Sequence, residues 1–117
     1  MHTILLVDDD EDLIEMVAFG LRQFGFKVCM YSECTDMNQK IIDCQPNLIL
    51  MDIFIGDVDG RKICFEIKNS AHQNIPIILY SAGNILPSSI KDSRADDFIQ
   101  KPFNFSELTQ KINDLAA

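Results

Sequence analysis

The sequence is poor in basic residues and lacks any long apolar run. It contains 10 Lys and Arg against 18 Asp and Glu, which gives a formal net charge of −8. Affinity for a nucleic-acid backbone needs clustered Lys and Arg, so we expect no direct nucleic-acid binding. An anionic membrane surface is disfavoured for the same reason. No apolar run reaches the roughly 20 residues of a membrane span, so we expect no membrane association.

The sequence also lacks an N-terminal basic stretch and paired cysteine motifs. The first apolar run ends at once in acidic residues, so no signal peptide is expected and the predicted location is cytoplasmic. The cysteines Cys29, Cys34, Cys44 and Cys64 form no C-x-x-C pair, and no histidine lies at a zinc-like spacing from them. We therefore expect reduced core thiols.

What remains is ordinary for one globular domain. The 117 residues are 47% hydrophobic and 24% charged, which excludes a disordered or fibrous chain and provides enough apolar surface for a core. We find no linker, internal repeat or low-complexity tract. The prediction is one domain over residues 1–117.

Short apolar runs alternate with helical patterns along the chain. Strands are predicted at 3–7, 26–31, 48–51, 76–80 and 97–99, and helices at 13–24, 35–44, 60–69 and 105–115. The segment 83–95 is polar and has the weakest pattern. This alternation predicts an α/β fold, with a parallel sheet and right-handed crossovers.

The helix signals differ in strength. The first helix has the spacing of one buried face, which we assign to Leu13, Met16, Val17, Gly20, Leu21 and Phe24. Gly25 fits the position that ends this helix. Asn104 and Glu107 have the spacing of a capping box at the start of the last helix.

Polar residues follow four of the predicted strands. Asp8 and Asp9 follow the first, Asp52 the third and Ser81 the fourth, and the fifth leads to Lys101. Functional sites in open parallel sheets lie at the carboxyl ends of the strands, so these residues should converge. Taken singly, each has an ordinary reading as a helix-start, turn or surface residue. The joint placement favours a functional site.

Three carboxylates at one edge require a counter-charge. At ~4 Å and an effective dielectric of ~20, one like-charge pair costs on the order of 4 kcal/mol. Mg²⁺ suits such an oxygen-rich site and also neutralises a phosphoryl group in transfer, as a lysine does. A carboxylate can itself accept the phosphoryl group, which makes Asp52 a candidate nucleophile.

With these residues in place, the whole sequence resembles the receiver domains of two-component response regulators. The motifs are Leu6-Val7-Asp8-Asp9-Asp10, Met51-Asp52-Ile53 with Asp59-Gly60, Pro76-Ile77-Ile78 before Ser81-Ala82, and Ala95-Asp96-Asp97-Phe98 before Lys101-Pro102-Phe103. The resemblance implies a flavodoxin-like (βα)5 fold, a doubly wound parallel sheet with strand order 2-1-3-4-5.

The resemblance also assigns roles at the site. It implies that Asp52 is the phosphoacceptor and that Ser81 and Lys101 contact the phosphoryl group. Mg²⁺ would be held by Asp9 directly, by Asp8 through water, by Asp52 and by the backbone carbonyl of Phe54. Ser81 and Phe98 would form the switch, and the Lys101-Pro102 bond would be cis.

The implied phosphodonor is a sensor histidine kinase or a phosphotransfer protein, and the output is a conformational change of the face built from the fourth helix, fifth strand and fifth helix. The output partner and oligomeric state stay open.

The rival hypothesis is a constitutive interaction module that does not use phosphate. A phosphatase or flavin enzyme is not supported, because no acid lies two residues after Asp52 and no Ser/Thr/Gly-rich loop follows the first strand.

Two departures from the family pattern affect loops. Gly56 replaces a usual proline after the phosphoacceptor position, which predicts a looser loop. The stretch between Ser81 and Lys101 is shortened, and Ser93-Arg94 replaces a usual glycine. The segment 87–94 can therefore form at most about two helical turns.

Overall fold

The computed structural model describes residues 2–83 and 85–116, and the strands and helices alternate as predicted. In chain order they are β1 (Thr3–Val7), α1 (Glu11–Gln23), β2 (Lys27–Tyr31), α2 (Met37–Cys44), β3 (Leu48–Asp52), β4 (Phe54–Ile55), β5 (Val58–Asp59), α3 (Gly60–Lys68), β6 (Ile77–Ser81), α4 (Pro87–Ser93), β7 (Asp97–Gln100) and α5 (Phe105–Ala116). Asn84, inside the segment of weakest pattern, lies outside the described residues.

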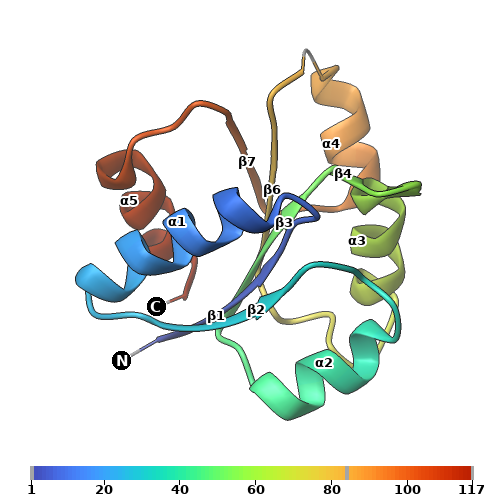
Figure 1. Cartoon of the computed structure of the whole chain (residues 1–117). Coiled ribbons are helices and arrows are strands. Elements are labelled where there is room, and N and C mark those ends of the chain that lie inside the picture. The colour runs from blue at the N-terminus through green and yellow to red at the C-terminus, as the bar shows by residue number, and fades with distance from the viewer. Residues whose placement is uncertain (1, 84, 117) are drawn as a thin grey trace.

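The main sheet has five parallel strands in the order β2-β1-β3-β6-β7. These are the five predicted strands, with β6 and β7 as the fourth and fifth, so the predicted order 2-1-3-4-5 and the flavodoxin-like fold are confirmed. Helices α1 and α5 cover one face, and α2, α3 and α4 cover the other (Figure 1). Strands β3 and β6 are buried along their whole length, because both faces of a doubly wound sheet are covered.

The buried face of α1 agrees only in part with the predicted one: Val17 and Leu21 are buried as predicted. The residues that the sheet covers are Ile14, Val17, Ala18 and Leu21. Met16 and Phe24, predicted to be inward, are 58% and 56% exposed. The prediction was wrong there because α1 is apolar over a wide arc, and two overlapping stripes both satisfy the helical spacing.

Gly25 has the local role that the sequence indicates, and Gly20 has a packing role that was not predicted from the sequence. A Cβ atom on Gly20 would collide with the ring of Phe105, so glycine lets α5 pack closely against α1. Gly25 follows the helix with φ +93°, a conformation that favours glycine. At the start of α5, the Glu107 N–H donates to Asn104 Oδ1 at 2.7 Å, which is one half of the predicted capping box.

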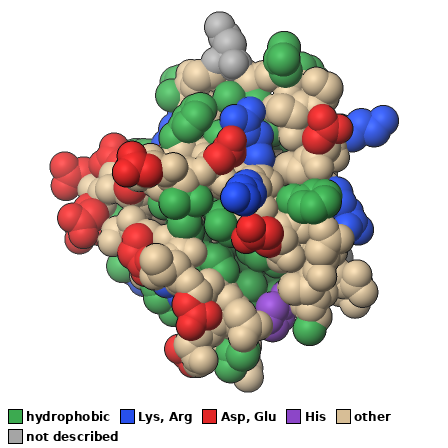
Figure 2. Space-filling model, turned by 90° about the vertical axis from the view of Figure 1, so that its right-hand side faces the viewer, with side chains coloured by type: hydrophobic (Ala, Val, Ile, Leu, Met, Phe, Trp, Pro, Cys, Tyr) green, Lys and Arg blue, Asp and Glu red, His purple; other side chains and the backbone are tan. Residues whose placement is uncertain are grey.

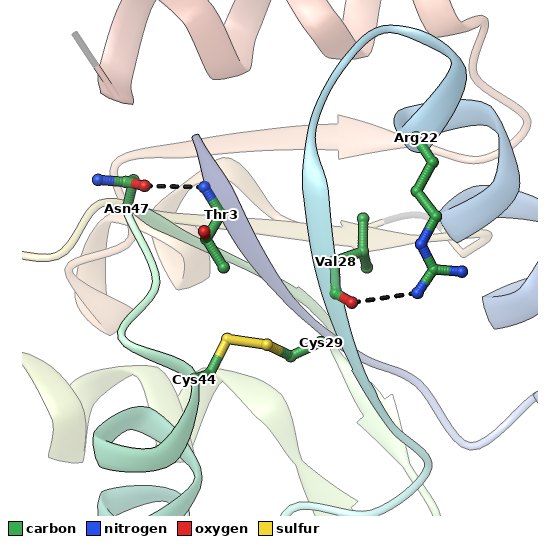
Figure 3. Close-up of a disulfide and its surroundings, with 6 residues drawn as sticks. All are labelled: Thr3, Arg22, Val28, Cys29, Cys44 and Asn47. Carbon is green, nitrogen blue, oxygen red and sulfur yellow. Dashed lines mark hydrogen bonds between the residues drawn. A yellow bond between two sulfur atoms is a disulfide. The ribbon is translucent and has the colours of Figure 1, made fainter. Parts of the chain in front are cut away.

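The cysteines are not all reduced. Cys29 on the edge strand β2 and Cys44 at the end of α2 form a disulfide with a Cα–Cα distance of 6.2 Å (Figure 3). The expectation of reduced thiols holds only for Cys34 and Cys64, which are free and buried. No C-x-x-C motif marks this pair, because packing of α2 on the sheet brings together residues that are 15 positions apart.

Two hydrogen bonds lie near the disulfide. The Thr3 N–H donates to Asn47 Oδ1 at 2.8 Å, and the Arg22 guanidinium donates to the Val28 carbonyl at 3.1 Å (Figure 3). They join β1 to the loop before β3, and α1 to β2. The outer strand β2 is therefore fixed at two points besides its ladder with β1, by the disulfide to α2 and by Arg22 of α1.

The loop after β3 is a short hairpin rather than the looser loop predicted. Strands β4 and β5 pair antiparallel, with Phe54 opposite Asp59. Gly56 lies in the turn with φ +58°, which a proline cannot adopt. This explains glycine at that position. Helix α4 has 7 residues, within the predicted limit of two turns.

Charge is unevenly distributed over the surface. Figure 2 shows the side formed by α2, α3 and α4, with acidic side chains gathered toward one edge and Lys and Arg toward the centre and the other edge.

Among the described residues, no helix combines the length and apolar character needed to cross a bilayer.

Candidate functional site

The carboxyl ends of the central strands bring three acids together. Asp8 directly follows β1, Asp9 is next to it, and Asp52 is the last residue of β3. One carboxylate oxygen from each lies within 4.8 Å of the others. Asp8 and Asp52 are buried and Asp9 is exposed, so the cluster opens to solvent on one side. The predicted convergence of these acids is what the structure shows.

Asp8 is fully buried, and both of its oxygens accept hydrogen bonds. Oδ1 accepts from the Asp10 N–H at 2.9 Å. Oδ2 accepts from the Tyr80 hydroxyl at 2.6 Å and from Lys101 Nζ at 3.3 Å. Burying a carboxylate is costly unless its oxygens are paired and hydrogen-bonded, as they are here.

Asp52 lies between a positive and a negative neighbour. Its Oδ2 accepts from Lys101 Nζ at 3.2 Å, and its Oδ1 from the Phe54 N–H at 3.3 Å. Burial and the charge of Asp8 raise the pKa of Asp52 above its usual value, and Lys101 opposes the rise. A further positive charge near Asp52 would therefore lower its pKa and favour its ionised form.

Glycine is required close to Asp52. A Cβ atom on Gly60 would collide with the Asp52 carbonyl oxygen, and the Gly60 N–H donates to the Ile53 carbonyl at 2.6 Å. The start of α3 therefore packs directly against the strand end that carries Asp52. A side chain at this position would displace that strand end.

Asp9 is held by the hairpin that follows β3. Its Oδ2 accepts a hydrogen bond from the Gly56 N–H at 2.9 Å. Proline, which has no N–H, could not make this bond. The departure at Gly56 therefore provides a donor to one of the three acids.

Ser81 lies at the same edge but makes no contact with the acids among the hydrogen bonds of the described residues. It is buried, and its hydroxyl oxygen accepts from the Gly83 N–H at 3.2 Å. Its carbonyl accepts from the Lys101 N–H at 2.9 Å, which aligns the two loops. The Lys101-Pro102 bond is cis, as the resemblance implied.

The two phenylalanines with predicted roles are placed differently: Phe98 packs against the core, whereas Phe54 lies beside Asp52. Phe98 on β7 is partly buried and packs against the core on the α2, α3 and α4 face. A cavity of about 510 Å³ lies beside it and is lined also by Ile85, Pro87 and Ile90. Phe54 on β4 is 53% exposed next to Asp52.

Sequence reasoning missed Tyr80. It was read only as the end of a buried strand, yet its hydroxyl reaches Asp8, and Lys101 Nζ lies 4.5 Å from its ring centroid. Burial, followed by the charge of Asp8, raises the pKa of Tyr80 above its usual value, so the hydroxyl stays protonated. A buried tyrosine needs a partner for its hydroxyl, and that rule is the signal that could have identified it.

The cluster fits a hard divalent cation. All three acidic ligands offer oxygen, which is the donor that Mg²⁺ prefers, and their spacing allows them to share one ion. Lys101 supplies a single positive charge to the two buried carboxylates. A divalent cation would offset the remaining negative charge.

The doubly wound sheet, with acids and a lysine at its carboxyl edge, belongs to the flavodoxin-like class. The family model of the response regulator receiver domain matches residues 4–113. The chain belongs to this family and is a receiver domain of the two-component response-regulator type.

Similar proteins agree with this assignment. The sensory transduction protein BceR of Halalkalibacterium halodurans is 32% identical over 114 residues, covering 96% of this chain and 48% of BceR. A putative response regulator from Chloroflexus aurantiacus has a TM-score of 0.89 at 25% identity, covering 98% of this chain and 97% of its own.

A third relative was solved with a ligand. The response regulator TrrA of Thermotoga maritima, in complex with Mg²⁺ and BeF, has a TM-score of 0.88 at 27% identity, covering 98% of this chain and 99% of its own. The chain spans about half the length of the curated relatives it matches.

Proposed function

We propose that this receiver domain accepts a phosphoryl group on Asp52 in a Mg²⁺-dependent reaction and acts as a switch in two-component signalling. The observation that carries the proposal is the cluster of Asp8, Asp9 and Asp52 oxygens within 4.8 Å, with Lys101 Nζ 3.2 Å from Asp52. The proposal covers residues 1–117 as one receiver domain.

The chemistry is transfer of a phosphoryl group to a carboxylate. An Asp52 oxygen forms a bond to phosphorus while the P–N bond of a phosphohistidine breaks, and the imidazole nitrogen keeps the electron pair of that bond and can take a proton. The ionised form of Asp52 is the nucleophile. Lys101 favours that form and stabilises the charge that develops on the phosphoryl oxygens.

Asp8, Asp9, Asp52 and the backbone carbonyl of Phe54 would hold the cation. When bound, Mg²⁺ neutralises charge on the carboxylates and on the transferring group. Ser81 would donate its hydroxyl to a phosphoryl oxygen, which requires the hydroxyl to turn toward Asp52. Phe98 would then repack on the face formed by α4, β7 and α5.

The proposed donor is a sensor histidine kinase or a phosphotransfer protein. An output partner or output domain would bind the altered face formed by α4, β7 and α5. The Mg²⁺ and BeF bound to TrrA, a relative of similar fold, support a phosphoryl-type site in this chain. A cytoplasmic location follows the family and is part of the proposal.

The test is phosphorylation by acetyl phosphate with Mg²⁺, followed by intact-mass analysis. The wild-type protein should gain one acid-stable, base-labile phosphoryl group. Asp52→Asn should gain none, because an amide is a poor nucleophile and a poor metal ligand. Asp57→Asn, in the turn of the hairpin that follows Asp52 but outside the acid cluster, is the matched control and should be labelled like wild type.

The rival function is a constitutive interaction module that does not use phosphate. A wild-type protein that stays unlabelled at high acetyl phosphate and Mg²⁺ would favour the module. Equal labelling of wild type and Asp52→Asn would instead show that another residue is the acceptor.

A further inference from the structure

Tyr80 connects the hydrophobic core to the acid cluster. Its ring is fully buried in the core between the sheet, α1 and α5, and it packs edge-on against Phe103 with ring centroids 6.0 Å apart. At the other end of the side chain, its hydroxyl donates to Asp8 Oδ2 at 2.6 Å. One rigid side chain therefore joins the packed core to a candidate metal ligand.

The register of the sheet explains how Tyr80 reaches the site. Tyr80 is the neighbour of Asp52 in the parallel pairing of β3 and β6. The Ile53 N–H donates to the Tyr80 carbonyl at 3.0 Å, which fixes the backbone at this level. The ring extends on the α1 and α5 face, where Asp8 and Lys101 also approach the strand ends.

Asp8 Oδ2 accepts from two donors, and only the Tyr80 hydroxyl is not shared with Asp52. Lys101 Nζ also contacts this oxygen, but it lies at similar distances from Asp8 and Asp52, 3.3 and 3.2 Å. If Lys101 turns toward a phosphoryl group on Asp52, Tyr80 remains on Asp8. With the Asp10 N–H on Oδ1, it fixes the orientation of the carboxylate.

We propose that Tyr80 is a positioning residue of this receiver site, whose hydroxyl holds Asp8 in the orientation that binds the divalent cation. The inference rests on the proposed function, because it assigns a role toward the cation of that site. Hydrogen bonds to a metal-ligating carboxylate set its orientation, and losing one typically weakens metal binding by about 10–100-fold.

The test is the affinity of the unphosphorylated protein for Mg²⁺, measured by amide NMR titration without a phosphodonor. Tyr80→Phe removes only the hydroxyl and keeps the ring in the core and beneath Lys101. We expect its Mg²⁺ dissociation constant to be about 10-fold higher than that of wild type. Tyr31→Phe changes the only other tyrosine of the sequence and should leave the constant unchanged.

A double-mutant cycle separates positioning from a general structural effect. In an Asp8→Asn background, Tyr80→Phe should weaken Mg²⁺ binding no further, because the hydroxyl acts through the Asp8 carboxylate. Equal Mg²⁺ constants for wild type and Tyr80→Phe would overturn the inference. So would a Tyr80→Phe loss of the same size in both backgrounds.

The controls also distinguish this inference from the proposed function. If wild type shows no Mg²⁺ response in the amide spectrum, the proposed function fails and the role of Tyr80 fails with it. If wild type binds Mg²⁺ and is phosphorylated on Asp52, while Tyr80→Phe binds Mg²⁺ equally well, only the role of Tyr80 is lost.

Discussion

Lys101→Met tests whether the lysine offsets two buried carboxylates. Lys101 Nζ lies 3.3 Å from Asp8 Oδ2 and 3.2 Å from Asp52 Oδ2, and these acids are 0% and 10% exposed in their side chains. At ~3.3 Å and an effective dielectric of ~20, each attraction is about 5 kcal/mol before desolvation. Removing one partner of a buried pair typically costs about 3–5 kcal/mol.

We expect Lys101→Met to lower the free energy of unfolding by about 3 kcal/mol at neutral pH without divalent cations, near the low end of that range because water can reach the site. Methionine keeps much of the side-chain volume, so the loss reports mainly on charge. The measurement is urea unfolding with a chelator present, compared with wild type under the same conditions.

The pH dependence gives the sharper test. Burial and Asp8 raise the folded-state pKa of Asp52, and Lys101 opposes this, so Lys101→Met should raise the pKa further. A carboxyl group whose pKa is raised in the folded state stabilises the fold when the pH is below its unfolded-state pKa. This stabilisation is lost as the pH rises through the folded-state pKa. The deficit of the variant should therefore be small below about pH 4 and should grow above it.

The matched control is Lys111→Met. Lys111 forms an ion pair with Asp97 at 3.0 Å, but both side chains are partly exposed. Its loss should cost less than about 1 kcal/mol. A Lys101→Met deficit that does not change with pH, or that equals the Lys111→Met deficit, would refute the reasoning.

Two further predictions concern the neighbourhood of the site, and a third concerns the disulfide. Phe54→Asn should shorten the lifetime of phosphorylated protein, because the exposed Phe54 ring beside Asp52 hinders a hydrolytic water; an equal or longer lifetime in a dephosphorylation time course would contradict this. Ser81→Ala should still be phosphorylated but show smaller beryllofluoride-induced amide shifts on α4, β7 and α5, and a full wild-type response would reject coupling through the hydroxyl. Reducing the Cys29–Cys44 disulfide should lower the free energy of unfolding by about 3 kcal/mol in urea titrations with and without a dithiol, since it spans 15 residues; no change would argue against the bond in solution.

The local sequence determined the elements and the strand-end acids. Apolar runs specify buried strands, and the breaks after them fix where Asp8, Asp52 and Ser81 fall. Parallel strands place their carboxyl ends at one edge, so the convergence of the acids follows from order alone. The start of α5 was also readable, because a cap depends on residues within one turn, as at Asn104.

Features that depend on helix rotation or on backbone dihedral angles, rather than on the order of residues, could not be predicted from the sequence. The apolar arc of α1 allows two buried stripes, and only packing on the sheet and on α5 selects the one that leaves Met16 exposed. The hairpin at Gly56 depends on a positive φ and on an N–H that reaches Asp9, across 47 positions in sequence. Periodicity carries no information about either.

Pairings between distant side chains were decided only by the tertiary structure. Tyr80 and Asp8 are 72 positions apart, and their hydrogen bond exists because β1, β3 and β6 are adjacent in the sheet. The Cys29–Cys44 disulfide likewise depends on where α2 ends against the edge strand. A sequence specifies which groups each element carries, whereas the distance between two groups is set by how the elements pack, because loop length limits that distance but does not fix it.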